Sequence, residues 1–109
     1  RTDAALAAAY PGIRHVAFGH VGDGNMHYNP VRPIDIPWET FRLQRGNINR
    51  IVHDIVAELN GSISAEHGIG RSRMMELAHY KSDVELDLLR TVKSALDPAN
   101  IMNPGKVLK

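Results

Sequence analysis

The segment His20-Val21-Gly22-Asp23-Gly24-Asn25-Met26-His27 constrains the fold of this chain more than any other. Asp-Gly between two short apolar runs is the strongest local signal for a tight β-hairpin, because a type I′ turn needs a positive φ at both central residues. With Asp23 and Gly24 at the turn, His20 faces His27. Directly opposed residues of an antiparallel pair have Cβ atoms about 5 Å apart. The two imidazoles are therefore predicted to lie on one face, close enough to share one divalent metal.

The strands of this hairpin are predicted over residues 13–21 and 26–29, with Pro30 ending the second strand. Side chains alternate between the two faces of a strand. Asn29 is therefore predicted to lie on the face of His27. His15 is predicted to lie on the opposite face, in a structural or solvated position.

A second polar cluster, Ser62-Ile63-Ser64-Ala65-Glu66-His67-Gly68-Ile69-Gly70, indicates a tight turn that carries a carboxylate beside a histidine. With His20 and His27, Glu66 completes a set of two imidazoles and one carboxylate. This set suits zinc, manganese or ferrous iron and leaves positions open for a substrate. Adjacent residues of an extended chain point to opposite sides, so one of Glu66 and His67 can bind the metal and the other can transfer a proton.

Helical periodicity covers much of the remaining chain. Apolar residues at 48, 51, 52, 55, 56 and 59 form one face of a helix predicted over residues 37–59, and this face is expected to cover the hairpin. Other helices are predicted over residues 4–10, capped by Asp3, and from Arg71 and Arg73 to about residue 78. A further helix follows the capping box of Ser82 and Glu85 and ends at Asp97-Pro98, before a turn-rich tail over residues 99–109. The predicted class is α+β, an antiparallel hairpin packed against helices, with a helical C-terminal part.

The composition limits the function classes. The 109 residues make one domain or less, and 13 basic against 12 acidic residues give a net charge of +1, which provides no electrostatic case for nucleic acid or a membrane surface. The absence of cysteine excludes disulfides and thiolate metal sites. No apolar run approaches the ~20 residues that span a bilayer. The sequence shows no signal peptide. Because it does not begin with methionine, we expect a piece of a longer polypeptide.

Three motifs together resemble the C-terminal domain of FAD-linked oxidases, the group of D-lactate dehydrogenase, glycolate oxidase and D-2-hydroxyglutarate dehydrogenase within the vanillyl-alcohol-oxidase-like flavoproteins. They are His-x-Gly-Asp-Gly-Asn-x-His at 20–27, Ser-Ala-Glu-His-Gly-Ile-Gly at 64–70, and Asp97-Pro98 followed by Ile-Met-Asn-Pro-Gly-Lys at 101–106. The motifs occur in the family's order. The resemblance implies that residues 1–109 are the C-terminal part of a larger cap domain, and the flavin-binding domain expected upstream is not within them.

The resemblance also implies an activity: oxidation of a D-2-hydroxy acid to a 2-oxo acid by FAD, which the absent domain mainly binds. A divalent metal, zinc before manganese or iron, is expected on His20, His27 and Glu66. His67 is expected to bind the substrate and accept its hydroxyl proton, and Asn29 to orient the substrate. Asn103 is expected to face the cofactor.

The expected partners are a small 2-hydroxy acid and the flavin-binding domain, without nucleic acid. The electron acceptor is undefined and a homodimer is left open, and the expected location is the cytoplasm or the inner face of a membrane. The 109 residues alone are expected to be inactive. Two alternatives remain: a metal-dependent hydrolase that uses the same two histidines and glutamate, and a non-catalytic cap or assembly module.

Overall fold

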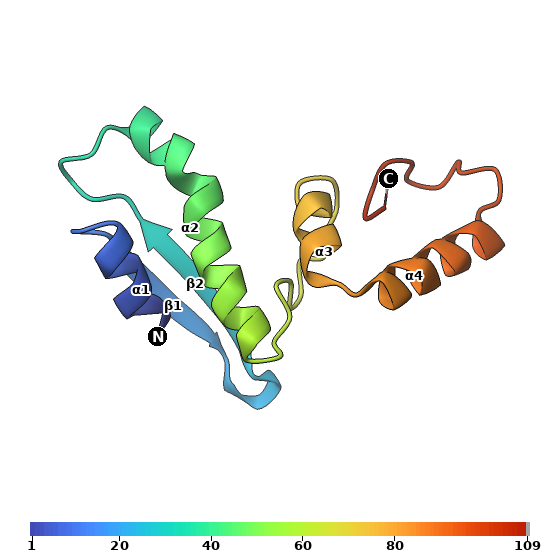
Figure 1. The fold of residues 1–109 in the computed structure, drawn as a ribbon, viewed down its shortest axis with the longest axis horizontal. Coiled ribbons are helices and arrows are strands. Elements are labelled where there is room, and N and C mark those ends of the chain that lie inside the picture. The colour runs from blue at the N-terminus through green and yellow to red at the C-terminus, as the bar shows by residue number, and fades with distance from the viewer. Residues whose placement is uncertain (109) are drawn as a thin grey trace. The chain divides into compact units, whose positions relative to one another are not determined.

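The computed structural model describes residues 1–108, and Lys109, the end of the predicted tail, lies outside the described residues. The chain folds into two units, Arg1–Ala65 and a second from Glu66 onward. The first contains α1 (Thr2–Ala9), β1 (Arg14–His20), a 3-10 turn (Val21–Asp23), β2 (Asn25–Val31) and α2 (Trp38–Glu58), and the second contains α3 (Met74–Tyr80) and α4 (Asp83–Leu96) (Figure 1). Helices with one antiparallel hairpin confirm the predicted α+β class. Within residues 1–108, no helix has the length and apolar character that a membrane crossing needs.

The hairpin forms where the sequence predicts it, but its register differs from the prediction. His20 pairs with Asn25, and Phe18 pairs with His27, so the predicted direct opposition of the two histidines is wrong. The reason lies in the turn. Gly24 has a φ of 63° and Asp23 has no positive φ, so the type I′ turn does not form, and a 3-10 turn closes a longer loop.

β2 also runs further than predicted, through Pro30 to Val31. Proline is tolerated there because a two-stranded sheet has only edge strands, and a missing N–H can face away from the ladder. The hairpin therefore presents a longer platform of alternating side chains than the sequence suggests.

Gly19 allows the two strands to approach closely at the turn end of the hairpin. A Cβ added at Gly19 would lie 2.0 Å from the Asn25 carbonyl oxygen, which is backbone and cannot rotate away. We expect Gly19→Ala to lower the free energy of unfolding by about 2 kcal/mol, measured by urea titration. Gly22→Ala, whose added Cβ meets nothing within 4 Å, is the matched control and should stay within about 0.5 kcal/mol of the parent. An equal loss in both variants would contradict the steric argument.

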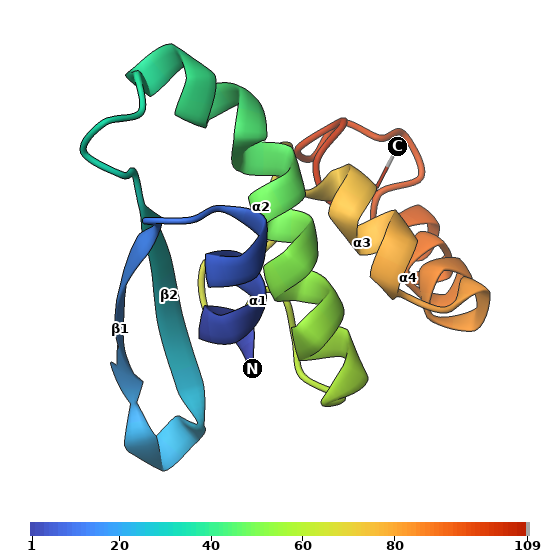
Figure 2. The same ribbon diagram turned by 60° about the vertical axis from the view of Figure 1, so that its left-hand side comes forward.

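Helix α1 supplies the core of the first unit. Leu6 on α1 and Ile48 on α2 are both buried, with 1% and 2% of their surfaces exposed. Figure 2 shows α1 beside α2, and the two helices pack directly against each other. The helix predicted over residues 37–59 is confirmed as α2. Its contact with α1 was not predicted from the sequence.

Asp3 does not cap α1, contrary to the prediction, because the helix begins at Thr2 with Arg1 in the N-cap position. The Asp3 carboxylate instead accepts a hydrogen bond from the Tyr28 hydroxyl at 2.7 Å, and His15 Nε2 lies 3.3 Å from the same oxygen. The rings of His15 and Tyr28 stack with centroids 5.2 Å apart. Asp3 thus attaches α1 to the face of the hairpin that carries His15.

The contact with Asp3 gives Tyr28 a measurable pH signature. Partial burial, the hydrogen bond to Asp3 and the Asp3 charge raise the pKa of Tyr28 from 10.0 to about 12. Because this pKa is higher in the folded state, the associated stability is fully present below about pH 10 and is lost as the pH rises from 10 to 12. We expect Asp3→Asn to bring the Tyr28 titration, followed by phenolate absorbance and assigned with Tyr28→Phe, back toward its ordinary value. Asp35→Asn, which removes an exposed carboxylate elsewhere in the unit, should leave it unchanged.

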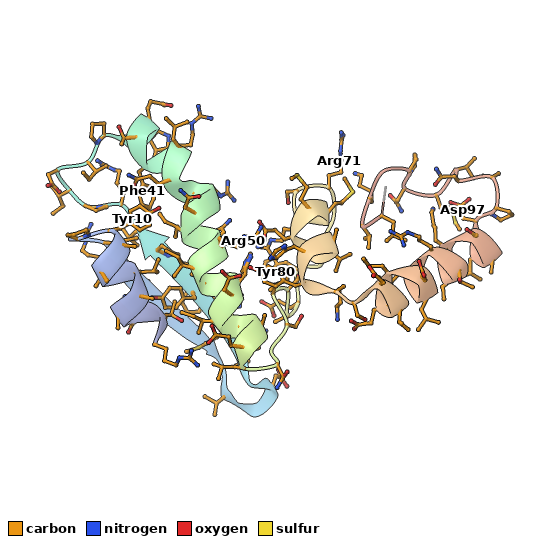
Figure 3. The ribbon with its side chains drawn as sticks, viewed as in Figure 1. Tyr10, Phe41, Arg50, Arg71, Tyr80 and Asp97 are labelled. Carbon is orange, nitrogen blue, oxygen red and sulfur yellow. The ribbon has the colours of Figure 1, made fainter. Side chains whose placement is uncertain are left out.

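The second unit follows local sequence signals closely. The Ser82 side chain accepts the Glu85 N–H and the Glu85 carboxylate accepts the Ser82 N–H, so the predicted capping box is confirmed. α4 ends at Leu96, directly before Asp97-Pro98, as predicted. The helix predicted to include Arg71 starts only at Met74, and Arg71 lies exposed in the preceding turn (Figure 3).

Candidate active site

His20 and His27 lie on the same face of the hairpin, although they are not directly opposed. The observed register differs from the predicted one by two residues, and side chains alternate with a period of two, so the face of each histidine is unchanged. The two imidazoles are diagonal neighbours, with ring centroids 5.9 Å apart and an edge-on arrangement at 66°. The sequence therefore predicts the shared face correctly through a wrong register.

This spacing suits a metal ion shared by the two rings. Two imidazoles that bind one zinc ion at about 2.1 Å through a nitrogen each bring their ring centres to roughly 5 Å from one another. The observed distance between the ring centroids is 5.9 Å, and a small side-chain rotation is enough to close the difference. His20 is exposed and His27 is half-buried, so both rings remain accessible from solvent. The pair thus offers two ligands of a type that zinc, manganese and ferrous iron accept.

Phe18 stacks on His27, a contact that the sequence reading missed. Their ring centroids are 4.9 Å apart with an interplanar angle of 13°, and Phe18 lies directly across the ladder from His27. Phe18 keeps 55% of its surface exposed, so burial does not explain its position. The signal was present in the sequence, because Phe18 precedes His20 by two residues and must share its face.

Asn29 lies on the same face as His27 by strand alternation and pairs with Val16. Asn29 is exposed. His15 lies on the opposite face, as predicted, where it contacts Asp3 and Tyr28. This face of the hairpin therefore combines two imidazoles, one amide and one aromatic ring.

Glu66 and His67 begin the second unit, in an irregular turn and not in an extended segment. His67 Nε2 lies 3.5 Å from Glu66 Oε1, so the turn brings together two side chains that an extended chain would separate. Both side chains are well exposed, 42% for Glu66 and 73% for His67. The glycines that follow make this turn possible, because Gly68 and Gly70 have φ values of 74° and 57°.

Asn103 lies in the C-terminal tail of the second unit, with a φ of 49° and an exposed surface. The tail returns to the Glu66–Gly70 loop, because the Val107 N–H donates a hydrogen bond to the Gly70 carbonyl at 2.8 Å. The structure therefore joins the third motif of the sequence to the second.

Comparisons with known proteins point to one family along the whole segment. The family model described as "FAD linked oxidases, C-terminal domain" matches residues 1–107. The chain is 40% identical to a D-2-hydroxyglutarate dehydrogenase of Stutzerimonas stutzeri over 96% of this chain and 23% of that protein. It is 36% identical to a D-lactate dehydrogenase of Archaeoglobus fulgidus over 95% of this chain and 22% of that protein. A mitochondrial D-2-hydroxyglutarate dehydrogenase of Rattus norvegicus is 38% identical over 90% of this chain and 18% of that protein. The chain spans less than a quarter of the length of these relatives.

Proposed function

Since the chain belongs to the family of FAD-linked oxidase C-terminal domains, we propose that it forms the substrate- and metal-binding part of an FAD-dependent D-2-hydroxy acid dehydrogenase. The observation that carries this proposal is the family match over residues 1–107, which includes all three motifs. The similarity to D-2-hydroxyglutarate and D-lactate dehydrogenases indicates a 2-hydroxy acid as the substrate class. It also favours the flavoenzyme over the metal-dependent hydrolase and the non-catalytic module.

His20, His27 and Glu66 are the proposed ligands of a divalent metal, zinc before manganese or iron. The paired imidazoles on one face of the hairpin support the first two ligands, and the exposed carboxylate of Glu66 supplies the third ligand type. Bound there, the metal would act as a Lewis acid that makes the substrate hydroxyl more acidic.

Oxidation of the hydroxy acid removes one proton from oxygen and one hydride from carbon, and leaves a 2-oxo acid. His67 is the proposed acceptor of the hydroxyl proton, and Asn29 the proposed donor that orients the substrate. FAD, the cofactor of the family, supplies the hydride acceptor. Asn103 is proposed to lie toward that cofactor. The proposal includes a flavin-binding domain elsewhere in the complete polypeptide, a location in the cytoplasm or at the inner face of a membrane, and a homodimer as the assembly to test.

The test is flavin reduction in the complete polypeptide that carries this segment. Under anaerobic conditions, D-2-hydroxyglutarate or D-lactate is expected to bleach the flavin absorbance, whereas L-lactate serves as the matched control and is not. Failure of every D-2-hydroxy acid, glycolate included, to reduce the flavin would contradict the proposed function.

The 109 residues alone are expected to show neither turnover nor tight FAD binding, because the proposed active site is shared with the flavin-binding domain. Fluorescence titration with FAD and an assay with an artificial electron acceptor check this prediction. Turnover by the isolated chain would show that the active site is complete within it.

A further inference from the structure

Asp97 is a buried carboxylate at the end of α4, and within residues 1–108 it is the only buried charged side chain, with 5% of its surface exposed (Figure 3). A buried charge is costly unless it is paired and hydrogen-bonded. Its two oxygens accept hydrogen bonds from the N–H groups of Ile101 and Met102, each at 2.9 Å. The side chain therefore folds the first turn of the C-terminal tail back onto the end of the helix.

Lys93, one turn earlier on α4, completes this arrangement. Its ammonium group pairs with the Asp97 carboxylate and also donates to the Met102 carbonyl at 2.6 Å. The Lys93 hydrogen bond lowers the pKa of Asp97 below its ordinary value, so the carboxylate stays charged at neutral pH. Residues 97–102 are thus held by one carboxylate and one ammonium group acting together.

The tail then turns back and reaches the loop that carries Glu66 and His67. Val107 has a φ of 64°, a conformation that a β-branched residue rarely adopts. The N–H of Val107 donates a hydrogen bond to the Gly70 carbonyl. Such strain persists only where the surrounding structure determines the backbone. A loop whose two glycines both have positive φ has few conformational preferences of its own. The hydrogen bond from Val107 connects the end of this loop to the C-terminal tail.

We propose that residues 97–107 form a tether that fixes the conformation of the Glu66–Gly70 loop, with Asp97 as the positioning residue at its base. The importance of the tether for turnover rests on the proposed function, because the loop that it fixes carries the proposed ligand Glu66 and the proposed base His67. Asp97 touches neither group and acts only through the tail.

Two variants of Val107 test the hydrogen bond, because both lose the valine side chain but only one keeps the backbone N–H. Val107→Pro removes the N–H and fixes φ near −65°, whereas Val107→Gly keeps the N–H and accepts the positive φ. In the full chain we expect hydrogen exchange of the peptide amides over residues 66–71 to accelerate about tenfold in Val107→Pro and to stay within about twofold of the parent in Val107→Gly. Equal exchange in the two variants would overturn the tether.

Asp97→Asn tests the base of the tether, and Asp87→Asn is its matched control, since Asp87 is an exposed carboxylate on the same helix that pairs with Arg90. Asp97→Asn is expected to accelerate exchange at residues 101–102 and at 66–71 together, and to shift the imidazole resonances of His67. Faster exchange at 101–102 with an unchanged loop would refute the positioning role. Hydrogen exchange is measured without substrate, so a failure of the proposed oxidation and a failure of the tether give separate results.

Discussion

Replacing His27 by alanine is expected to weaken zinc binding by this chain roughly a hundredfold. Structural zinc sites gain about 10–16 kcal/mol from four ligands, so one ligand accounts for roughly 3 kcal/mol. The same replacement is expected to reduce flavin reduction by D-2-hydroxy acids in the complete polypeptide by a similar factor or more, because the metal is proposed to acidify the substrate hydroxyl. Isothermal titration with zinc and the anaerobic flavin assay measure the two effects.

His15→Ala is the matched control for this prediction. His15 is an imidazole on the same hairpin, but it lies on the opposite face beside Asp3 and Tyr28. If zinc binds through any exposed histidine, the two variants lose the same affinity, and the proposed site on His20 and His27 is wrong. If His15→Ala binds zinc as the parent does, the face of the hairpin determines the site.

The face of the hairpin could be predicted from sequence because it depends only on parity. An Asp-Gly turn and a period of two place His20, His27 and Asn29 together whether the register is shifted by two residues or not. The register itself could not be predicted, since it depends on whether Asp23 adopts a positive φ. Asp23 does not adopt a positive φ, so the loop between the two strands is longer than a two-residue turn.

Contacts between distant segments were the part that the sequence did not reveal. Asp3 is a reasonable helix cap by its type and position, yet its carboxylate binds Tyr28, which lies 25 residues away. Likewise, the bond from Val107 to Gly70 joins two loops with no periodic pattern. In contrast, the capping box of Ser82 and Glu85 was predicted correctly because both its residues lie within one helical turn.

The largest effect on turnover is expected from His67→Asn. A positioned general base contributes about 10²–10⁴ to a rate, so we expect kcat for D-2-hydroxy acid oxidation in the complete polypeptide to fall by that factor. Asparagine keeps a polar side chain of similar reach but cannot accept the proton at neutral pH.

Metal affinity separates the roles proposed for His67 and its neighbour Glu66, whose side chains lie 3.5 Å apart. If His67 is the base and Glu66 the ligand, His67→Asn keeps its zinc affinity within about threefold of the parent while kcat collapses. If zinc affinity falls as well, His67 is itself a ligand and the two roles must be exchanged. His79→Asn, which removes an exposed imidazole from α3 in the same unit, should change neither quantity. A parent-like kcat in His67→Asn would contradict the proposed role of His67 as the base. The Glu66 carboxylate would then have to accept the hydroxyl proton while also binding the metal.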